Sequence, residues 1–275
     1  MVDWDMNQIV GGRDIFVMTL DTLRYDVAQS CWQRGATPNL AKVMPATGWQ
    51  RRHSPGSFTY SAHQAIFAGF LPTPVGPGPH PRLFAARFEG SETTTSETFV
   101  FDEATWIEGL AAVGYHTVCI GGVGFFNKQT ALCRVLPGLF SESHWSREMG
   151  VASAQSMETQ VQLAVDRLGE SPADRRILLF INASAIHQPN CLFGMQTEDS
   201  CSTQAEALQY VDACLPPLFE ALRRRGPSCC LIFSDHGTAY GEDGYHGHRL
   251  AHQVVWDVPY AQFLLDAVEG EAANV

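Results

Sequence analysis

Short apolar segments alternate along this chain with longer amphipathic segments, and this alternation constrains the fold more than any other feature of the sequence. The apolar segments predict buried strands over residues 14–20, 116–120, 177–181, 229–233 and 260–265. The amphipathic segments predict helices over residues 61–70, 103–113, 153–168 and 203–225. Such alternation is typical of β-α units, so we expect an α/β fold with a mostly parallel central sheet flanked by helices on both faces.

The composition is that of a globular protein with one sizeable core. The 275 residues are 45% hydrophobic and 17% charged, which excludes intrinsic disorder. Residues 73–81 are rich in proline and glycine, and residues 90–98 are rich in serine and threonine. Both segments predict loops that are too short to separate two domains. We therefore expect residues 1–275 to form a single domain.

The charge balance limits the classes of partner. Lys and Arg number 18 and Asp and Glu number 29, so the formal net charge is −11. Proteins that bind nucleic acid or an anionic membrane gain most of their affinity from a basic face, so we expect neither partner. The N-terminal segment lacks the pattern of a signal peptide, and no apolar run has the length of a membrane span. We expect a cytoplasmic protein with reduced cysteines, and the sequence leaves its oligomeric state open.

Polar side chains follow three of the predicted strands directly. Asp21 follows the first strand, Asn182 and His187 follow strand 177–181, and Asp235 and His236 follow strand 229–233. In open α/β sheets, ligands bind beyond the carboxyl ends of the strands. The sequence therefore brings oxygen and imidazole donors to one edge of the sheet, where we expect a metal centre.

The segment after Asp235 is rich in histidine. Four of the ten histidines lie within it, namely His236, His246, His248 and His252. Imidazole and carboxylate together suit zinc, manganese or iron better than calcium or magnesium. Asp235 and His236 close a buried strand and are expected ligands, whereas each of the other three histidines is either a ligand or a solvated loop residue.

A hydroxyl group stands where a polar turn meets the start of a predicted helix, in SFTYSAHQAIFAGFLP. Thr59 or Ser61 would face unpaired backbone N–H groups and the positive end of the helix dipole, a setting that favours phosphate-like anions. The alternative is that one of these residues is the helix N-cap, the commonest role of Ser and Thr at such a position.

Several segments together resemble one family. DIFVMTLDTLRYD, ATPNLAKV, SFTYSAHQAIFAGFLP, AVGYHTVCIGG, INASAIHQP, AEALQYVD and SDHGTAYGEDGYHGHR occur in the order seen in the sulfatase-like, metal-dependent hydrolase branch of the alkaline phosphatase superfamily. The resemblance covers residues 14–263 and implies a single alkaline-phosphatase-like hydrolase domain. Asp21, Asp235 and His236 match metal ligands of that family, and Thr59 matches the nucleophile, which also coordinates the metal.

The resemblance implies roles for further histidines. Either His246 or His248 looks like the distal histidine that binds a second metal or the substrate, and His187, in a His-x-Pro motif, resembles a residue that does similar work. The sequence also departs from the family at Thr22, which replaces an acid of the first metal site, and at Asn182, near the place of an acid in two-zinc relatives. Both the number of ions, one or two, and their identity, zinc or manganese, therefore remain open.

The nucleophile position decides the predicted reaction. Sulfatases oxidise a Cys or Ser at this position to an aldehyde hydrate, which a Thr cannot form. We expect a phosphatase or phosphodiesterase that hydrolyses small phosphate monoesters or diesters, or phosphonate esters, through a covalent phospho-threonine intermediate. Arg24, Asn127, Lys128 and His187 are candidate substrate contacts, although Arg24 is equally suited to an ion pair with Asp26.

Two alternatives keep part of this interpretation. The first is a transferase that uses the same site to pass the phospho group to another acceptor. The second is a non-catalytic protein that binds metal or a phosphorylated ligand as a partner subunit. A dinucleotide-binding Rossmann domain is disfavoured, because the Gly-rich segment GGVGFF lacks the spaced GxGxxG pattern. His63, four residues after Thr59, is expected to support Thr59 rather than to bind metal.

Overall fold

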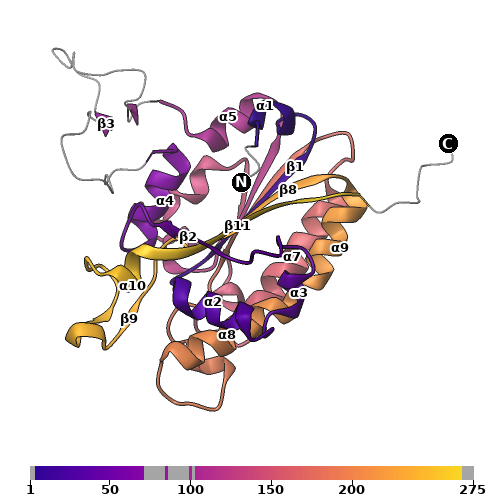
Figure 1. Cartoon of the computed structure of the whole chain (residues 1–275). Coiled ribbons are helices and arrows are strands. Elements are labelled where there is room, and N and C mark those ends of the chain that lie inside the picture. Colours follow the sequence, from indigo (N-terminus) through magenta and orange to yellow (C-terminus); the bar gives the residue numbers. More distant parts are fainter. Residues whose placement is uncertain (1–3, 71–83, 86–98, 101–102, 268–275) are drawn as a thin grey trace.

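The computed structural model describes residues 4–70, 84–85, 99–100 and 103–267, so the two predicted loops over residues 73–81 and 90–98 lie outside the described residues. A seven-stranded sheet forms the centre, in the order β2-β11-β8-β1-β7-β5-β6 (Figure 1). The strands are β1 (Asp14–Leu20), β2 (Gln50–His53), β5 (His116–Ile120), β6 (Glu142–His144), β7 (Ile177–Ala183), β8 (Ser228–Phe233) and β11 (Asp257–Leu265). β11 runs antiparallel to both of its neighbours, and the pairs among β8, β1, β7, β5 and β6 are parallel. The predicted α/β fold with a mostly parallel sheet is confirmed.

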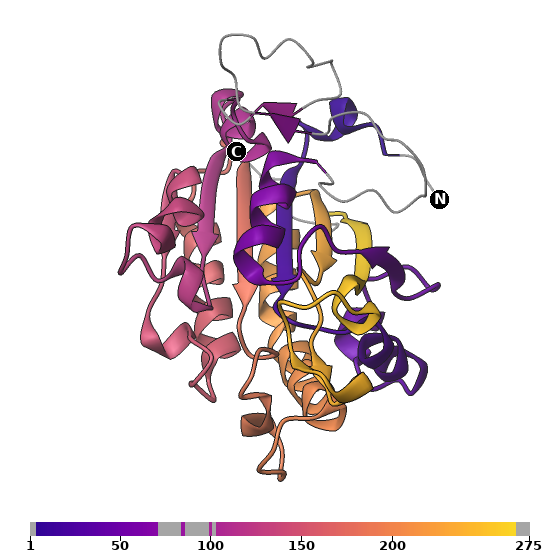
Figure 2. The ribbon, with the colours of Figure 1, turned by 90° about the vertical axis from the view of Figure 1, so that its left-hand side faces the viewer.

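The alternation of side chains along the strands builds one core on each face of the sheet. Phe16 and Met18 of β1 point into the first core, and Ile15 and Val17 point into the second. The first core is closed by α2 (Tyr25–Gln33), α7 (Ser156–Glu170), α8 (Cys201–Cys214) and α9 (Pro216–Arg225). The second is closed by α4 (Thr59–Ala68) and α5 (Trp106–Ala112). Figures 1 and 2 show helices on both faces of the sheet.

Shorter elements complete the described part of the chain. The helices are α1 (Met6–Ile9), α3 (Pro38–Ala41), α6 (Leu132–Val135) and α10 (Gln253–Trp256), with five single 3₁₀ turns, η1 (Gly124–Phe126), η2 (Pro137–Leu139), η3 (Arg147–Met149), η4 (Asn190–Phe193) and η5 (Glu242–Gly244). Two small sheets pair β3 (Phe84–Ala85) with β4 (Phe99–Val100), and β9 (Ala239–Tyr240) with β10 (His246–Gly247). Among the described residues, no helix is long and apolar enough to cross a membrane.

The prediction of one helix over residues 203–225 is wrong, because the structure contains two helices there. α8 ends at Cys214 and α9 begins at Pro216. A proline lacks the N–H group that would continue the first helix but fits the first position of the next, so two consecutive prolines separate the helices. The edge strands β2 and β6 were not predicted, since their short polar sequences QRRH and ESH carry no apolar alternation.

The sheet brings three polar strand ends together. β1 lies between β8 and β7, and Thr19 is paired with Phe233 on one side and with Asn182 on the other. The residues that follow β1 and β8 therefore leave the sheet at the same edge. Because neighbouring parallel strands advance in step, the position of Asp21 relative to Asp235 is set by the sheet rather than by a loop.

A buried ion pair lies at the opposite end of the central strands, where β1 and β7 begin. Asp14, at the start of β1, is fully buried and accepts hydrogen bonds from Arg225 Nε at 2.8 Å and from the backbone N–H of Ile177 at 2.9 Å. The Arg225 guanidinium also donates to the carbonyl groups of Ser171 at 2.8 Å and Pro172 at 3.0 Å. This pair thus links β1, β7 and the end of α9.

Replacement of Asp14 by alanine should destabilise the protein, because it leaves the buried Arg225 charge without its partner. We expect Asp14→Ala to lower the free energy of unfolding by about 3–5 kcal/mol, measured by urea denaturation. Asp14→Asn is the matched control, since its side-chain oxygen still accepts a hydrogen bond, and it should lose less. A decrease in the free energy of unfolding of less than about 1 kcal/mol for Asp14→Ala would show that the pair contributes little to stability.

Candidate metal centre and nucleophile

Three side chains from two neighbouring strands meet at the carboxyl edge of the sheet. Asp21 directly follows β1, and Asp235 and His236 follow β8; all three are fully buried. One ligand atom of each lies within 4.8 Å of the others. His236 Nε2 is 3.9 Å from Asp21 Oδ1 and 3.5 Å from Asp235 Oδ2. We call these three residues the Asp-Asp-His cluster.

The two inner carboxylate oxygens of the cluster lack hydrogen-bond donors. Asp21 Oδ1 and Asp235 Oδ2 have no hydrogen-bond partner among the described residues. His236 Nδ1 lies 2.8 Å from the carbonyl oxygen of Gly237, which can only accept, so Nδ1 carries the hydrogen and Nε2 presents a lone pair to the carboxylates. Two carboxylate oxygens and a lone pair in a buried site repel one another unless a cation lies among them. The donor set therefore fits a divalent cation such as zinc or manganese.

The outer oxygens of both carboxylates are held in place. Asp21 Oδ2 accepts a hydrogen bond from Asn182 Nδ2 at 3.1 Å. Asp235 Oδ1 accepts from the backbone N–H groups of Thr22 at 3.3 Å and His236 at 3.0 Å. These bonds orient each carboxylate so that its free oxygen points into the cluster.

Burial shifts the pKa values of the cluster toward the uncharged forms. It raises the pKa of Asp21 to about 6, with a further increase from the charge of Asp235. It raises the pKa of Asp235 to about 7, and it lowers the pKa of His236. A bound divalent cation would reverse these shifts for the carboxylates, because it stabilises their charged form.

Gly237 allows the backbone after His236 to pass close to α10, the short helix that precedes β11. A Cβ atom at Gly237 would lie 2.0 Å from the carbonyl oxygen of Val254, a distance at which the backbone would have to move. The Gly237 N–H donates to the carbonyl of Val255 at 2.7 Å. Packing around the cluster therefore requires a glycine at this position of the Asp-His-Gly motif.

Thr59 places a hydroxyl group beside the cluster. Its Oγ1 lies 3.4 Å from Asp21 Oδ2 and 3.4 Å from His236 Nε2, and the residue is buried. The N-cap of α4 is Phe58, which makes no side-chain capping bond, so neither Thr59 nor Ser61 is the N-cap. Ser61 Oγ donates to the carbonyl of Phe58 at 3.0 Å and is turned back onto the helix. Of the two candidate hydroxyl groups, the structure brings that of Thr59 to the cluster.

A series of buried polar side chains links the sheet to the backbone of Thr59. Asn182 Nδ2 donates to Thr19 Oγ1 at 3.2 Å, Thr19 Oγ1 lies 3.1 Å from His63 Nε2, and His63 Nδ1 lies 2.8 Å from the carbonyl oxygen of Thr59. Burial lowers the pKa of His63 to about 3, so its ring is neutral. The contact between His63 and Thr59 agrees with the support expected of His63. Thr19 and Asn182 were not predicted to have this role, although each is a polar residue within an apolar strand, and that signal could have indicated it.

The loop after His236 brings only some of its histidines to the cluster. The ring centroid of His248 lies 4.7 Å from that of His236 and 5.6 Å from that of His187. His246 is exposed and its ring lies beside Gly241, and His252 Nε2 lies 3.1 Å from Asp243 Oδ2. Between the two candidates for the distal histidine, the geometry favours His248. Metal binding by either residue stays a prediction.

Arg24 is occupied by acidic side chains. Its Nε and Nη2 donate to Asp26 at 2.9 Å and 2.6 Å, and its Nη1 donates to Glu242. The ion pair with Asp26, one of the two predicted alternatives, is present. Because Glu242 lies in the histidine-bearing loop, Arg24 also anchors this loop to the segment after β1.

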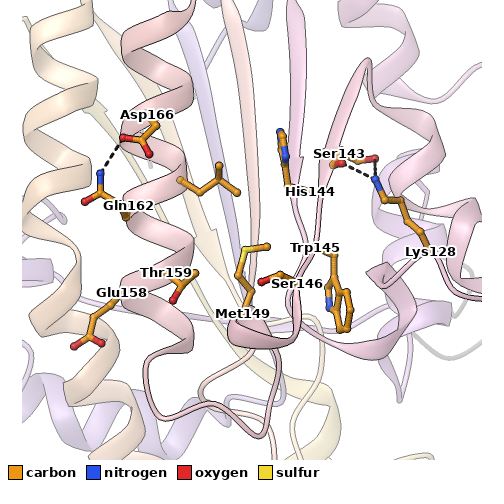
Figure 3. A pocket seen from close by; sticks show the side chains of 11 residues that line it. Lys128, Ser143, His144, Trp145, Ser146, Met149, Glu158, Thr159, Gln162 and Asp166 are labelled. Carbon is orange, nitrogen blue, oxygen red and sulfur yellow. Dashed lines mark hydrogen bonds between the residues drawn. The ribbon is translucent and has the colours of Figure 1, made fainter.

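Lys128 and Asn127 lie in a different region. Lys128 Nζ donates to the carbonyl of Ser143 at 2.6 Å, and Asn127 Oδ1 accepts from the N–H of Gln129 at 2.9 Å. Lys128 lines a cavity of about 860 Å³ between β6 and α7, with Trp145 and Asp166 among the other lining residues (Figure 3). Neither Thr59 nor the Asp-Asp-His cluster lines this cavity. Substrate contacts by Lys128 and Asn127 stay predictions.

Zinc should stabilise the protein through the cluster. Added to chelator-stripped protein at about a hundred times its Kd, zinc should raise the melting temperature by about 5–10 °C, measured by thermal denaturation. Asp235→Asn should abolish this increase, because it removes an anionic ligand. Asp243→Asn, in an exposed acid of the same loop, is the control and should keep it. An undiminished increase in Asp235→Asn would place the metal elsewhere.

The stability of the metal-free protein should show the raised pKa of Asp235. Between about pH 4 and pH 7 the folded state binds a proton that the unfolded state lacks, so this carboxyl destabilises the fold most above pH 7 and less as the pH falls. We expect Asp235→Asn to be more stable than the metal-free wild type at pH 8, and the difference to shrink toward pH 5. Urea denaturation across this range measures it, and a difference independent of pH would contradict the shift.

No protein-family model and no curated protein sequence matches this chain. Solved structures do match. The C-terminal periplasmic domain of phosphoethanolamine transferase EptC from Campylobacter jejuni is 14% identical, with a TM-score of 0.60 over 94% of this chain and 82% of that chain. The C-terminal periplasmic domain of EcEptC from Escherichia coli, solved in complex with zinc, is 13% identical, with a TM-score of 0.63 over 95% of this chain and 74% of that one.

A membrane protein also matches. The integral membrane lipooligosaccharide phosphoethanolamine transferase A from Neisseria meningitidis is 14% identical, with a TM-score of 0.61 over 92% of this chain and 48% of that chain. This chain therefore spans about half the length of that protein. The chain has the fold of sulfatase-like and alkaline-phosphatase-like domains, and the resemblance indicated by its sequence motifs is confirmed at the level of the fold.

Proposed function

We propose that this chain is a metal-dependent enzyme that hydrolyses small phosphate or phosphonate esters through a covalent intermediate on Thr59. The observation that carries this proposal is the position of the Thr59 hydroxyl, 3.4 Å from both Asp21 Oδ2 and His236 Nε2, beside carboxylate oxygens that lack hydrogen-bond partners. A hydroxyl at the start of a helix and next to a cation site is the arrangement that nucleophilic phosphoryl transfer needs.

The cluster would hold the cation. Asp21, Asp235 and His236 are the residues that would bind it, and zinc is supported by the similar domain that was solved with zinc. When bound there, a divalent cation lowers the pKa of a neighbouring hydroxyl and neutralises charge on phosphoryl oxygens. His248 and His187 lie beside the cluster and would contact either a second ion or the substrate.

The chain's own residues orient the nucleophile. Thr59 Oγ1 attacks phosphorus and gives up its proton to water, so the Oγ1–P bond forms while the bond from phosphorus to the leaving oxygen breaks, and the leaving oxygen takes up a proton from water. A second water then attacks the phosphorus bound to Thr59, which restores the Thr59 hydroxyl and releases phosphate from a monoester, a phosphate monoester from a diester or a phosphonate from a phosphonate ester. His63 holds the Thr59 carbonyl and Asn182 holds Asp21, so both groups keep their positions through the two steps. The first turn of α4, which has no side-chain cap, presents backbone N–H groups to a phosphoryl oxygen.

The chemistry of Thr59 supports phosphate rather than sulfate esters. Sulfatases of similar fold use an aldehyde made from Cys or Ser, and a threonine cannot form it. The net charge of −11 also favours a small substrate over a polyanion, which the protein surface would repel.

Transfer to an alcohol or amine is the second candidate function. It is favoured by the names of the similar structures, several of which are phosphoethanolamine transferases. A transferase would use the same Thr59 intermediate but would pass the phospho group to an acceptor other than water. Product analysis with and without an added alcohol separates the two, because only a transferase makes a new ester as its main product.

Loss of the Thr59 hydroxyl should abolish turnover. With zinc or manganese restored to chelator-stripped protein, Thr59→Ala should reduce release of the aryl alcohol from aryl phosphate monoesters and diesters by at least about three orders of magnitude. Thr59→Ser keeps the hydroxyl and should retain measurable activity. Both variants should keep the wild-type melting temperature to within a few degrees.

The same assay includes results that contradict the proposal. Undiminished turnover in Thr59→Ala would exclude Thr59 as the nucleophile. Faster cleavage of an aryl sulfate than of either phosphate ester would contradict the substrate class. Zinc binding without any turnover or transfer would leave a non-catalytic metal-binding protein.

A further inference from the structure

Arg249 is attached to both sides of the candidate site. It directly follows His248, and its backbone N–H donates to the carbonyl of Ser57 at 2.8 Å. Its guanidinium carbon lies 5.6 Å from the centroid of the Phe58 ring, and Phe58 directly precedes Thr59. The loop that carries His248 and the turn that carries the nucleophile therefore meet at Arg249.

The charge of Arg249 is not used by another protein group. Arg249 forms no ion pair with a carboxylate among the described residues, whereas Arg24 is bound by Asp26 and Glu242. Its side chain is exposed and its guanidinium carbon lies over the ring of Phe58, so the guanidinium N–H groups are accessible to a ligand.

The backbone of Arg249 adopts a conformation that is rare for residues other than glycine. Its φ is +70°, in the left-handed region, where residues other than glycine are uncommon. The hydrogen bond to Ser57 restrains this conformation, in which the guanidinium carbon lies over the Phe58 ring. Strain of this kind is maintained only where the surroundings determine the conformation, and it gathers at functional sites.

The charge balance of the site calls for one more cation. Asp21 and Asp235, when ionised, contribute two negative charges, which a divalent cation cancels. A phosphate ester adds one or two further negative charges, and a guanidinium matches phosphoryl oxygens in both charge and geometry.

We propose that Arg249 binds a non-bridging oxygen of the substrate's phosphoryl group, in an anion subsite between Phe58 and His248. This inference rests on the proposed function and deepens it, because it assigns a substrate-binding residue that lies outside the metal cluster. The subsite would accept a phosphoryl group presented to Thr59 and would bind inorganic phosphate as the product.

Binding of inorganic phosphate to the zinc-loaded 275-residue chain tests the subsite directly. We expect Arg249→Gln to weaken phosphate binding by about ten- to a hundredfold in isothermal titration calorimetry, the loss of a charged hydrogen bond. Arg249→Lys should recover part of the affinity, since it keeps the charge but not the planar donor pair. Arg224→Ala, an exposed arginine at the end of α9, is the matched control and should bind phosphate like the wild type.

The zinc-dependent increase in melting temperature separates substrate binding from a structural role. Arg249→Gln should keep this increase, because Arg249 is not a metal ligand. A fall in the melting temperature of Arg249→Gln with unchanged phosphate affinity would show that Arg249 only ties the loop to Phe58, and would overturn the proposal.

Turnover measured in parallel distinguishes the two proposals. In one outcome, the wild type cleaves aryl phosphates and Arg249→Gln has the same phosphate affinity and the same kcat/KM as the wild type. This result overturns the subsite but leaves the proposed function standing. A wild type without turnover that binds phosphate through Arg249 supports the subsite and contradicts the hydrolase. Absence of phosphate binding to the zinc-loaded wild type overturns the subsite.

Discussion

Two buried carboxylates face the Nε2 atom of a buried imidazole, and neither Asp21 Oδ1 nor Asp235 Oδ2 has a hydrogen-bond partner among the described residues. The rest of the site is arranged around this unfavourable group. Asp21, Asp235 and His236 stay within 4.8 Å only because β1 and β8 are neighbours in a sheet whose core strands are buried on both faces. A flexible loop would relieve such repulsion by moving apart, whereas paired strands resist it. A divalent cation turns the repulsion into attraction, which is why the geometry points to a metal centre.

The nucleophile is held by the same sheet through a different route. Asn182 binds Asp21 and Thr19, Thr19 contacts His63, and His63 contacts the backbone of Thr59. The position of the hydroxyl is thus coupled to that of the metal ligand through buried hydrogen bonds, which are strong in a low-dielectric interior. Across the site, the histidine-bearing loop is anchored by Arg24 and joined to the nucleophile turn by Arg249. The cluster, the nucleophile and the proposed anion subsite therefore belong to one connected structure.

Much of the fold could be predicted from local patterns, and the failures have physical causes. The bounds of β1 and β5 agree with the predicted strands, because apolar runs of strand length leave few alternatives. Pro216 divides a helix that periodicity alone would continue. The short polar edge strands β2 and β6 exist because a neighbouring strand offers backbone partners, and their own sequences carry no signal for this. Within the site, the convergence of Asp21 with Asp235 and His236 could be predicted because these residues directly follow two strands whose carboxyl ends meet at the same edge of the sheet.

The sequence by itself determined the α/β class, the strand ends that carry the acids and the presence of a hydroxyl group near the start of a helix, because each depends on the residue types within a few positions of one another. The structure decided that this helix begins at Thr59 and that the hydroxyl group of Thr59, rather than that of Ser61, reaches the cluster. Only the tertiary structure decided which histidine of the loop lies at the cluster, with His248 beside His236 and His246 exposed. It also decided that Arg24 is bound by Glu242, 218 positions away, in addition to the nearby Asp26 that the sequence had already offered as a partner. Arg249 has no acidic partner among the described residues. These outcomes depend on contacts between separate segments of the chain, and such contacts leave no periodic trace in the sequence.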